Sequence, residues 1–355
     1  MVAPPGPSAV NGFGFREHGG PDRLTQLSLP TPTPGPGEVA VRVAAASFNR
    51  LDRFVLAGIP GVPIERPHVL GSDAAGWVDT LGPGAVAPPV GTRVLVNPGI
   101  WDGTCDACRA GREALCRELR ILGEHTQGSL TERIVVPDRN VHAIPDSLGF
   151  PEAAAAPLVF QTAWRALATV GGVQPGERVA VIGAGGAVAP AATQVAKLLG
   201  ATVVVVTRSA AKSDAARAAG ADDVLVVDPS TGHDRALWEW SGRRGVDVVF
   251  DSVGAPTLPR SVRALARGGR AVVIGATAGP IAEVDLRTLF WRQASIRGST
   301  MASRREFEEV RDHLFAGRLR AVVDRVYPFA EARAAFDRLE AADVFGKVVV
   351  ELPAR

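Results

Sequence analysis

The sequence predicts an α/β protein in which a mainly β region is combined with a doubly wound parallel sheet. Short strand-like runs separated by Gly and Pro fill the first third of the chain. Strand-like and helix-like runs then alternate from residue 178 to residue 274, which is typical of a parallel sheet covered by helices. A glycine cluster, Gly183-Ala184-Gly185-Gly186, follows the first strand of that alternation.

Composition excludes several classes of protein. The chain has 355 residues, of which 46% are hydrophobic and 21% charged, values ordinary for one or two globular domains. A net charge of +2 gives no reason to expect nucleic acid or a membrane surface as partner. No apolar run reaches the ~18–20 residues of a membrane span, and the N-terminus lacks the charged and apolar regions of a signal peptide. We therefore expect a cytoplasmic protein that binds a small-molecule substrate.

The first third of the chain reads as β-rich. Glu38–Ala45 alternates between apolar and polar residues after a turn-rich stretch, and Gly and Pro separate the apolar runs that follow. Those runs are Gly76–Leu81, Arg93–Asn97 and Glu132–Pro137. Short strands with such turns predict a barrel-like or sandwich-like unit.

The pattern changes near Pro151. Glu152–Val170 is rich in Ala, Leu and Trp at helical spacing, and alternating strands and helices follow it. The predicted strands are Arg178–Gly183, Thr202–Val206, Val224–Val227, Val246–Asp251 and Arg270–Ile274. The predicted helices are Ala187–Leu199, Ser209–Ala219, His233–Ser241 and Thr257–Ala266. The last stretch predicts the helix Arg304–Ala316, the strand Ala321–Tyr327, the helix Phe329–Ala341 and the strand Lys347–Leu352.

The glycine cluster has the pattern of a dinucleotide-binding turn. Glycines let the chain turn tightly and let a pyrophosphate approach the backbone, and the free N–H groups at the following helix start hold its negative charge. The position at the start of the α/β alternation strengthens this prediction. The predicted contacts of the turn are Gly183, Gly185, Gly186, Ala187 and Val188.

The end of the second strand indicates which dinucleotide is bound. Sites that prefer NAD usually carry an acidic residue there for the ribose hydroxyls, whereas this chain has Thr207-Arg208-Ser209, with Lys212 one turn further on. An acidic residue would repel a 2′-phosphate and an arginine attracts it, so the sequence predicts NADP(H). The alternative is that Arg208 and Lys212 are solvated surface charges.

Three cysteines and an aspartate have the spacing of a structural metal site. The pattern is Asp102-x2-Cys105-x2-Cys108-x7-Cys116. Zinc accepts thiolate and carboxylate ligands, so one aspartate with three cysteines is a reasonable set. We expect one structural zinc at Asp102, Cys105, Cys108 and Cys116; the alternative is an empty loop with three free thiols.

Several motifs together resemble the medium-chain dehydrogenase/reductase superfamily, which includes zinc-type alcohol dehydrogenases and quinone oxidoreductases. The resemblance runs nearly end to end. It implies a GroES-like catalytic domain over residues 1–157 and 304–355, a Rossmann nucleotide-binding domain over residues 158–303, and a homodimer formed through Gln293–Thr300. The motifs that carry it are Ser47–Asp52, Pro67–Gly76, the cysteine loop, Thr162–Trp164, the glycine turn, Gly298–Thr300 and Phe345–Lys347.

The resemblance also shows that the catalytic-zinc ligands are missing. Family alcohol dehydrogenases hold that zinc with a Cys, a His and a second Cys. The matching positions here are Asn49, Ser72 and Leu158, which cannot replace thiolate and imidazole on zinc. His68 and Asp73 lie nearby in the sequence, but we expect His68 to pack beside the strand. The reaction centre is therefore predicted to work without a metal.

Without a zinc to polarise a carbonyl, reduction of a quinone or of a double bond conjugated to a carbonyl is easier than alcohol oxidation. We expect Asn49, Ser72 and Thr162 to be the polar groups that face the substrate carbonyl, and Asp52 to orient Asn49. The alternative for each of the three is a structural hydrogen bond. The resemblance implies further cofactor contacts, which also include Asn49 and Thr162. They are Ser252, Val253, Gly275, Ala276, Ser299, Thr300 and Lys347.

Three hypotheses for the function follow. The leading one is an NADPH-dependent reductase of an activated double bond or quinone. The second is an aldehyde/ketone reductase with a substituted carbonyl-polarising site. The third is a protein that binds NADPH without turnover. All three need the same cofactor site, so the sequence leaves them open.

Overall fold

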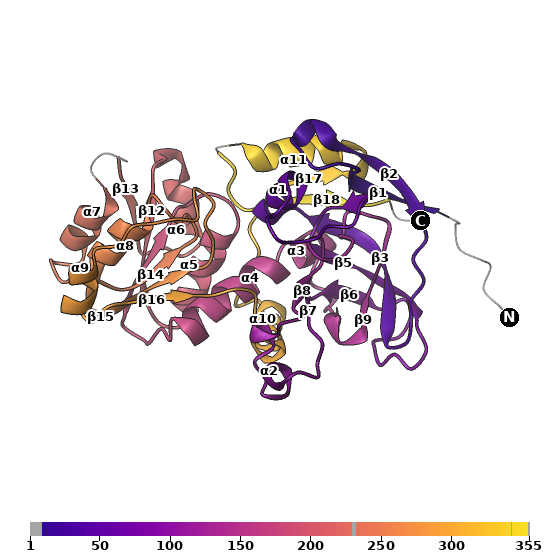
Figure 1. Ribbon diagram of the computed structural model, residues 1–355, viewed down its shortest axis with the longest axis horizontal. Helices are drawn as coiled ribbons and strands as arrows, with labels where there is room; N and C mark the ends of the chain where they lie inside the picture. Colours follow the sequence, from indigo (N-terminus) through magenta and orange to yellow (C-terminus); the bar gives the residue numbers. More distant parts are fainter. Residues whose placement is uncertain (1–8, 229–231, 342, 354–355) are drawn as a thin grey trace. The chain divides into compact units, whose positions relative to one another are not determined.

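The computed structural model describes residues 9–228, 232–341 and 343–353. Its contacts divide the chain into two compact units, one made of Met1–Leu158 with Val323–Arg355 and the other of Val159–Val322 (Figure 1). The chain thus returns to the first unit at Val323, whereas the sequence placed that return at residue 304.

The difference has a physical reason in helix α10 (Arg304–Phe315), which is tied to the start of the second unit. Arg165 Nη1 lies 3.0 Å from both carboxylate oxygens of Glu306. The indole Nε1 of Trp164 donates to Glu309 at 3.0 Å. These contacts keep α10 with the nucleotide-binding fold.

The first unit is mainly β. A seven-stranded sheet has the order β10-β6-β5-β3-β18-β17, with β9 also paired to β3; a three-stranded sheet has the order β2-β1-β4, and β7 pairs with β8. The strands are β1 (Ala9–Phe15), β2 (Leu24–Pro30), β3 (Glu38–Ser47), β4 (His68–Val69), β5 (Asp73–Leu81), β6 (Arg93–Val96), β7 (Gly99–Ile100), β8 (Arg120–Ile121), β9 (Arg133–Pro137), β10 (Val141–Ala143), β17 (Val323–Pro328) and β18 (Lys347–Glu351).

Short helices connect these strands. The α-helices of the unit are α1 (Arg50–Ala57), α2 (Asp106–Arg109), α3 (Phe150–Ala154) and α11 (Ala332–Glu340). The 3-10 turns are η1 (Pro21–Arg23), η2 (Glu113–Leu115), η3 (Asp138–Asn140) and η6 (Phe329–Glu331). The strands predicted at residues 38–45, 76–81, 93–97 and 132–137 are present, while β1 and β2 were not predicted.

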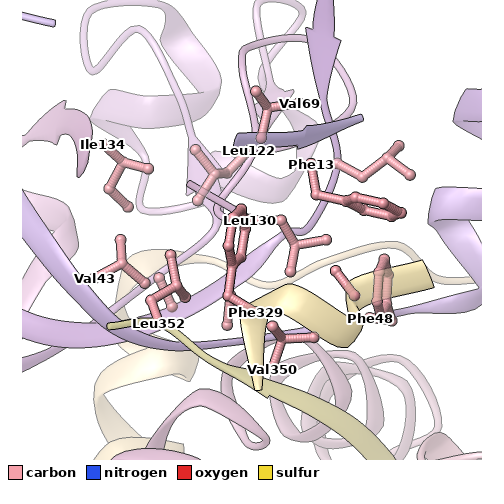
Figure 2. Close-up of a cluster of buried hydrophobic side chains, with 14 of the residues drawn as sticks. Phe13, Val43, Phe48, Val69, Leu122, Leu130, Ile134, Phe329, Val350 and Leu352 are labelled. Atoms are coloured by element: carbon pink, nitrogen blue, oxygen red, sulfur yellow. The ribbon is translucent and has the colours of Figure 1, made fainter. Parts of the chain in front are cut away.

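Both ends of the chain build the core of this unit (Figure 2). Phe48, which follows β3, packs edge-on against Phe13 of β1 and Phe336 of α11, with ring centroids 6.4 and 5.5 Å apart. Val350 of β18 belongs to the same buried cluster. Aromatic side chains supply much of the area that a core removes from water, so the first unit depends on its C-terminal segment.

The second unit contains a six-stranded parallel sheet with the order β13-β12-β11-β14-β15-β16. The strands are β11 (Arg178–Ile182), β12 (Thr202–Thr207), β13 (Asp223–Val226), β14 (Val246–Asp251), β15 (Leu265–Val273) and β16 (Ser295–Gly298). The strand order runs outward in both directions from β11 and β14. Right-handed crossovers therefore place helices on both faces, as expected for a doubly wound sheet.

The helices of the second unit follow the predicted alternation. They are α5 (Val188–Leu198), η5 (Ala210–Lys212), α6 (Ser213–Ala218), α7 (His233–Trp240), α8 (Leu258–Ala264), α9 (Leu286–Trp291) and α10. The single helix predicted over residues 152–170 is divided into α3, α4 (Pro157–Trp164) and the π-helix η4 (Arg165–Val170). Pro157 explains the first break, because proline is tolerated in a first helical turn and disrupts a helix interior.

Within the described residues, no helix combines the length and the apolarity that crossing a membrane requires.

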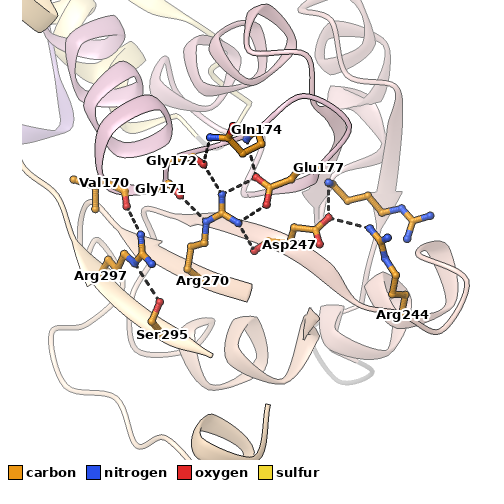
Figure 3. A network of polar contacts seen from close by, with 11 residues as sticks. Val170, Gly171, Gly172, Gln174, Glu177, Arg244, Asp247, Arg270, Ser295 and Arg297 are labelled. Atoms are coloured by element: carbon orange, nitrogen blue, oxygen red, sulfur yellow. Dashed lines mark hydrogen bonds and ion pairs between the residues drawn. The ribbon is translucent and has the colours of Figure 1, made fainter. Parts of the chain in front are cut away.

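One buried arginine fastens the parallel sheet to the loop that precedes it (Figure 3). The guanidinium of Arg270 donates to the carbonyls of Gly171 and Gly172 at 2.5 and 2.9 Å, and to both carboxylate oxygens of Glu177 at 2.6 Å. The Arg270 side chain is 9% exposed. A bidentate pair of this kind is strongly directional, so it fixes where β15 lies relative to the start of β11.

Arg270→Met should lower the free energy of unfolding by about 3 kcal/mol, because it removes the buried cation that pairs with Glu177 and that donates to two carbonyls. Arg244→Met is the matched control. Arg244 pairs with Asp247 at 3.0 Å, but its side chain is 56% exposed, so its loss should cost less than about 1 kcal/mol. Urea unfolding of both variants measures the difference; equal losses would contradict the assigned role of Arg270.

Candidate active site and cofactor site

The residue at the first family zinc position, Asn49, is the N-cap of helix α1. Asp52 accepts the backbone N–H of Asn49 at 2.7 Å and forms a capping box with it. The other Asp52 oxygen accepts the N–H of Gly71, also at 2.7 Å. Asp52 is fully buried. Asp52 therefore fixes the backbone of Asn49, and its predicted role in orienting Asn49 toward a substrate stays a prediction.

The side chain of Asn49 belongs to a buried cluster centred on Asp73. Asp73 Oδ2 accepts hydrogen bonds from Asn49 Nδ2 at 2.8 Å and from Lys347 Nζ at 2.6 Å. Lys347 Nζ also donates to Asn49 Oδ1 at 2.7 Å. Asp73 is 0% exposed, Lys347 2% and Asn49 6%. Lys347 was predicted to contact the cofactor, and the structure engages its ammonium in this cluster.

The other two family zinc positions lie beside the same carboxylate. Leu158, in the first turn of α4, donates its backbone N–H to Asp73 Oδ1 at 2.7 Å. Ser72 precedes Asp73 in the chain and is fully buried, and its hydroxyl has no hydrogen-bond partner among the described residues. An unpaired buried hydroxyl is costly, which fits a group kept for a ligand. Thr162 lies one turn beyond Leu158 on α4 and belongs to the second unit.

The predicted cofactor contacts of the second unit follow the carboxyl ends of its parallel strands. The sheet order reverses between β11 and β14, and ligands of such sheets bind at that reversal. Three of the five groups of predicted residues directly follow a strand, a fourth begins two residues after one, and the fifth begins at the last residue of a strand. These groups are Gly183–Val188 after β11, Thr207–Ser209 at the end of β12, Ser252 and Val253 after β14, Gly275 and Ala276 after β15, and Ser299 and Thr300 after β16.

The glycine turn fits a pyrophosphate. Gly183 has a φ of 89° and Gly186 a φ of 75°, values that favour glycine. Helix α5 begins at Val188 without a side-chain cap, and the first N–H groups of a helix have no partner within it. Ser299 has a buried hydroxyl with no partner among the described residues. These features match an anion-binding and nucleotide-binding edge.

Asp251, which sequence reasoning missed, shapes the loop after β14. Its Oδ1 accepts the N–H groups of Val253 and Gly254 at 2.9 and 3.1 Å and the hydroxyl of Thr257 at 2.9 Å. Its Oδ2 accepts from Ser261 at 2.9 Å. The loop that carries Ser252 and Val253 is thus held rigidly at the edge of the sheet.

The residues that would distinguish NADP from NAD differ in exposure. Arg208 is exposed at the end of β12. Lys212 is 8% exposed, and the hydroxyl of Thr207 bonds within its own turn to the N–H of Ser209 at 3.1 Å. Arg208 is therefore the predicted residue best placed to meet a phosphate from solvent.

The cysteine loop brings four ligand atoms together. The donor atoms of Asp102, Cys105, Cys108 and Cys116 all lie within 4.8 Å of one another, and no other such group of His, Cys, Asp or Glu occurs among the described residues. Asp102 Oδ1 accepts the N–H groups of Thr104 and Cys105 at 2.6 and 2.9 Å. The side chains of Cys108 and Cys116 also hydrogen-bond to this carboxylate. The donor set and spacing fit tetrahedral zinc.

Comparison with known proteins decides the family. A model described as zinc-binding dehydrogenase matches residues 187–316, and one described as alcohol dehydrogenase GroES-like domain matches residues 35–146. An acryloyl-coenzyme A reductase from Metallosphaera sedula is 31% identical, over 88% of this chain and 91% of its own length. The chain belongs to the zinc-binding dehydrogenase family.

Solved structures of family members agree with this assignment. An NAD-dependent alcohol dehydrogenase is 40% identical with a TM-score of 0.91, covering 97% of this chain and 100% of its own. A 2-octenoyl-CoA carboxylase reductase in complex with NADP and 2-octenoyl-CoA is 29% identical with a TM-score of 0.89, covering 98% and 88%. The predicted superfamily, the GroES-like plus Rossmann fold and the oxidoreductase class are confirmed. The relatives thus include both CoA-thioester reductases and alcohol dehydrogenases.

Family zinc positions and structure together explain the site. Asn49 and Leu158 hydrogen-bond to Asp73, and Ser72 precedes it in the chain; the resemblance implies that these three positions match the catalytic-metal ligands of family alcohol dehydrogenases. Sequence reasoning did not recognise Asp73 as the centre of the cluster, because its main partner, Lys347, lies 274 residues away. The adjacent Ser72, at the family histidine position, was the available signal.

The pKa of Asp52 gives a test of this site. Burial raises that pKa from 3.8 to about 6, against the lowering effect of the N–H groups of Asn49 and Gly71. A raised carboxyl pKa in the folded state contributes stability that is complete below pH 3.8 and is lost as the pH rises through about 6.

Asp52→Asn removes this titration. The free energy of unfolding of the wild type minus that of the variant should therefore fall by about 3 kcal/mol between about pH 4 and pH 7. Denaturant unfolding across that range measures it. A difference that does not change with pH would mean that Asp52 titrates alike in the folded and unfolded chain.

Proposed function

We propose that this protein is an NADPH-dependent reductase of a carbon–carbon double bond conjugated to a carbonyl, as in an enone, a quinone or an enoyl thioester, with no metal at its reaction centre. One observation carries the proposal. The positions that hold catalytic zinc in related alcohol dehydrogenases contain Asn49, Ser72 and Leu158, gathered around a buried Asp73–Lys347 pair. The acryloyl-coenzyme A reductase and the 2-octenoyl-CoA carboxylase reductase among the relatives support the substrate class.

The chemistry follows from the residues present. A bound nicotinamide supplies a hydride. A conjugated acceptor is already electron-deficient, so the protein need only stabilise the negative charge that develops on the carbonyl oxygen. The hydroxyl of Ser72 and the amide of Asn49, both in the first unit, are neutral donors suited to that oxygen. Thr162, in the second unit, stays a predicted contact. The described site offers no evident acid, so we assign the proton to solvent.

We assign the cofactor to the carboxyl edge of the parallel sheet. Gly183, Gly185 and Gly186 admit the pyrophosphate, and the start of α5 faces its charge. Arg208 contacts the 2′-phosphate, which makes the cofactor NADP(H); the alternative is that Arg208 is a solvated surface charge. The relative with a TM-score of 0.91 is NAD-dependent, so the preference is a property to be tested.

We assign a structural zinc to Asp102, Cys105, Cys108 and Cys116. The loop has little core of its own: Trp101, Cys108 and Cys116 form a small cluster beside Leu119. A metal would supply the cross-link that such a loop lacks. The alternative remains an empty loop with three free thiols.

We also propose a homodimer formed through residues 293–300, in a cytoplasmic protein. Strand β16 is an edge strand of its sheet and leaves one row of backbone groups unpaired within the described chain. In the preceding helix α9, Leu286, Phe290 and Trp291 are 66–68% exposed. An apolar helix face beside an open strand edge fits a second copy of the chain.

Reduction of an aldehyde or ketone is the second candidate, because the 40% identical solved structure is an alcohol dehydrogenase. The deciding experiment measures NADPH consumption with enones, quinones, enoyl thioesters and aldehydes, with a chelator present and NADH as control. Chelator-resistant turnover to a saturated carbonyl product supports the proposal. An alcohol product would favour the second candidate, and bound NADPH without any turnover would favour a binding role.

Arg208→Ala should weaken NADPH binding by about 10–100-fold and leave NADH binding within about twofold, because a charge-assisted bond to the 2′-phosphate is lost. Arg217→Ala is the control, since Arg217 pairs with Asp223 at 3.3 Å at the start of β13, away from the carboxyl edge of the sheet. Fluorescence titration gives both dissociation constants. If Arg208→Ala weakened NADPH binding and NADH binding equally, Arg208 would not recognise the 2′-phosphate.

Metal analysis should find about one zinc per chain. Cys108→Ser should lose it and melt roughly 5–10 °C lower. Asp106→Asn, in the same loop at a fully exposed carboxylate that pairs with Arg109 at 3.9 Å, should keep zinc and stability. Zinc-free wild type with the melting temperature of Cys108→Ser would establish the empty loop.

A further inference from the structure

The amide of Asn49 can adopt only one of its two orientations in its buried surroundings. Lys347 Nζ is a donor only, and it lies 2.7 Å from Asn49 Oδ1. The ionised Asp73 carboxylate is an acceptor only, and its Oδ2 lies 2.8 Å from Asn49 Nδ2. A flipped amide would set oxygen against carboxylate and N–H against ammonium, which loses two charge-assisted hydrogen bonds.

The backbone of Asn49 is held independently of its side chain. Asp52 accepts its N–H at 2.7 Å, and helix α1 starts at the next residue. With backbone and amide both fixed, the second hydrogen of Nδ2 has a set direction, and the described residues offer it no further acceptor. Asn49 retains 6% of its surface, whereas Asp73 and Ser72 retain none. The free N–H therefore belongs to the most exposed residue of the cluster, since Lys347 retains 2%.

We propose that Lys347 and Asp73 are positioning residues, which lock the Asn49 amide so that its remaining N–H is a preorganised donor where related enzymes place a metal ligand. The ammonium and the carboxylate cancel in charge, so the cluster presents a neutral donor. A fixed donor needs no reorganisation when charge develops on a substrate oxygen. The catalytic consequence rests on the proposed function, while the locked amide itself is a property of the folded chain.

The locked amide can be observed without any substrate. The chain contains four asparagines, Asn11, Asn49, Asn97 and Asn140, so labelling with 15N-asparagine yields four side-chain amide signal pairs, and Asn49→Ala identifies the Asn49 pair. In the wild type, one Asn49 amide proton should exchange with solvent at least about tenfold more slowly than the other and than those of the exposed Asn11. Equal, fast exchange of both protons would overturn the proposal.

Variants test whether Lys347 and Asp73 act through Asn49. Lys347→Met with Asp73→Asn removes both charges together, which avoids an uncompensated buried ion, and keeps an oxygen for the N–H of Leu158. This double variant should release the Asn49 protection, while Asn140, whose Nδ2 donates to the Asn97 carbonyl at 2.7 Å, keeps its signals. Unchanged Asn49 exchange would contradict the lock; if the double variant does not fold, the wild-type exchange rates still decide.

Kinetics then connects the lock to activity. With an acceptor that the wild type reduces, Asn49→Ala and the double variant should each lower kcat/KM by about 10–100-fold. The triple variant should fall no further than Asn49→Ala, because residues that act through one donor are not additive. If the losses in kcat/KM of Asn49→Ala and of the double variant multiplied in the triple variant, Lys347 and Asp73 would not act through Asn49. A wild type without turnover, with protected Asn49 protons, would refute the proposed function and leave the lock standing.

Discussion

The buried ion pair between Asp73 and Lys347 is the contact on which the candidate active site depends. It joins β5 to β18, strands at opposite ends of the chain that both pair with β3. Two buried charges are stable together only when their hydrogen-bonding capacity is filled. Asn49, Leu158 and Lys347 fill that of Asp73. The candidate site is therefore complete only when the C-terminal strand β18 is paired into the sheet of the first unit.

The cluster also gives a physical account of how the site differs from a metal centre. A catalytic zinc needs thiolate, imidazole or carboxylate ligands with free lone pairs. Here Asn49 and Ser72 replace such ligands, and the ammonium of Lys347 lies 2.7 Å from Asn49 Oδ1. A second cation beside that ammonium would be repelled at short range. Under the proposed function, hydrogen-bond donation to a substrate oxygen takes the role that a metal has in related enzymes.

Sequence reasoning predicted best where the determinants are local or strongly apolar. Strand β14 has the predicted bounds, because a strand buried on both faces is a continuous apolar run. The capping of α1 by Asn49 and Asp52 involves neighbours three residues apart. Strands β1 and β2 were missed, since Gly12 and Gly14 weaken the strand pattern in β1. The sequence prediction placed the return of the chain to the first unit at residue 304 and not at Val323, because only tertiary contacts hold α10 in the second unit.

The candidate site could be predicted residue by residue only in part. Asn49 and Ser72 follow from the family positions they occupy, and the glycine turn from its place between strand and helix. The roles of Asp73 and Lys347 could not be predicted, because their contact arises from sheet pairing between segments 274 residues apart. The rigid loop around Asp251 depends likewise on how β14 ends within the folded sheet.

The most direct test of the central claim is a crystal of the purified protein measured for anomalous scattering at the zinc absorption edge. The account predicts a single anomalous peak, among Asp102, Cys105, Cys108 and Cys116, and ordinary density around Asn49, Ser72 and Asp73. A second peak bonded to Asp73 or Ser72 would show a metal at the reaction centre and contradict the account.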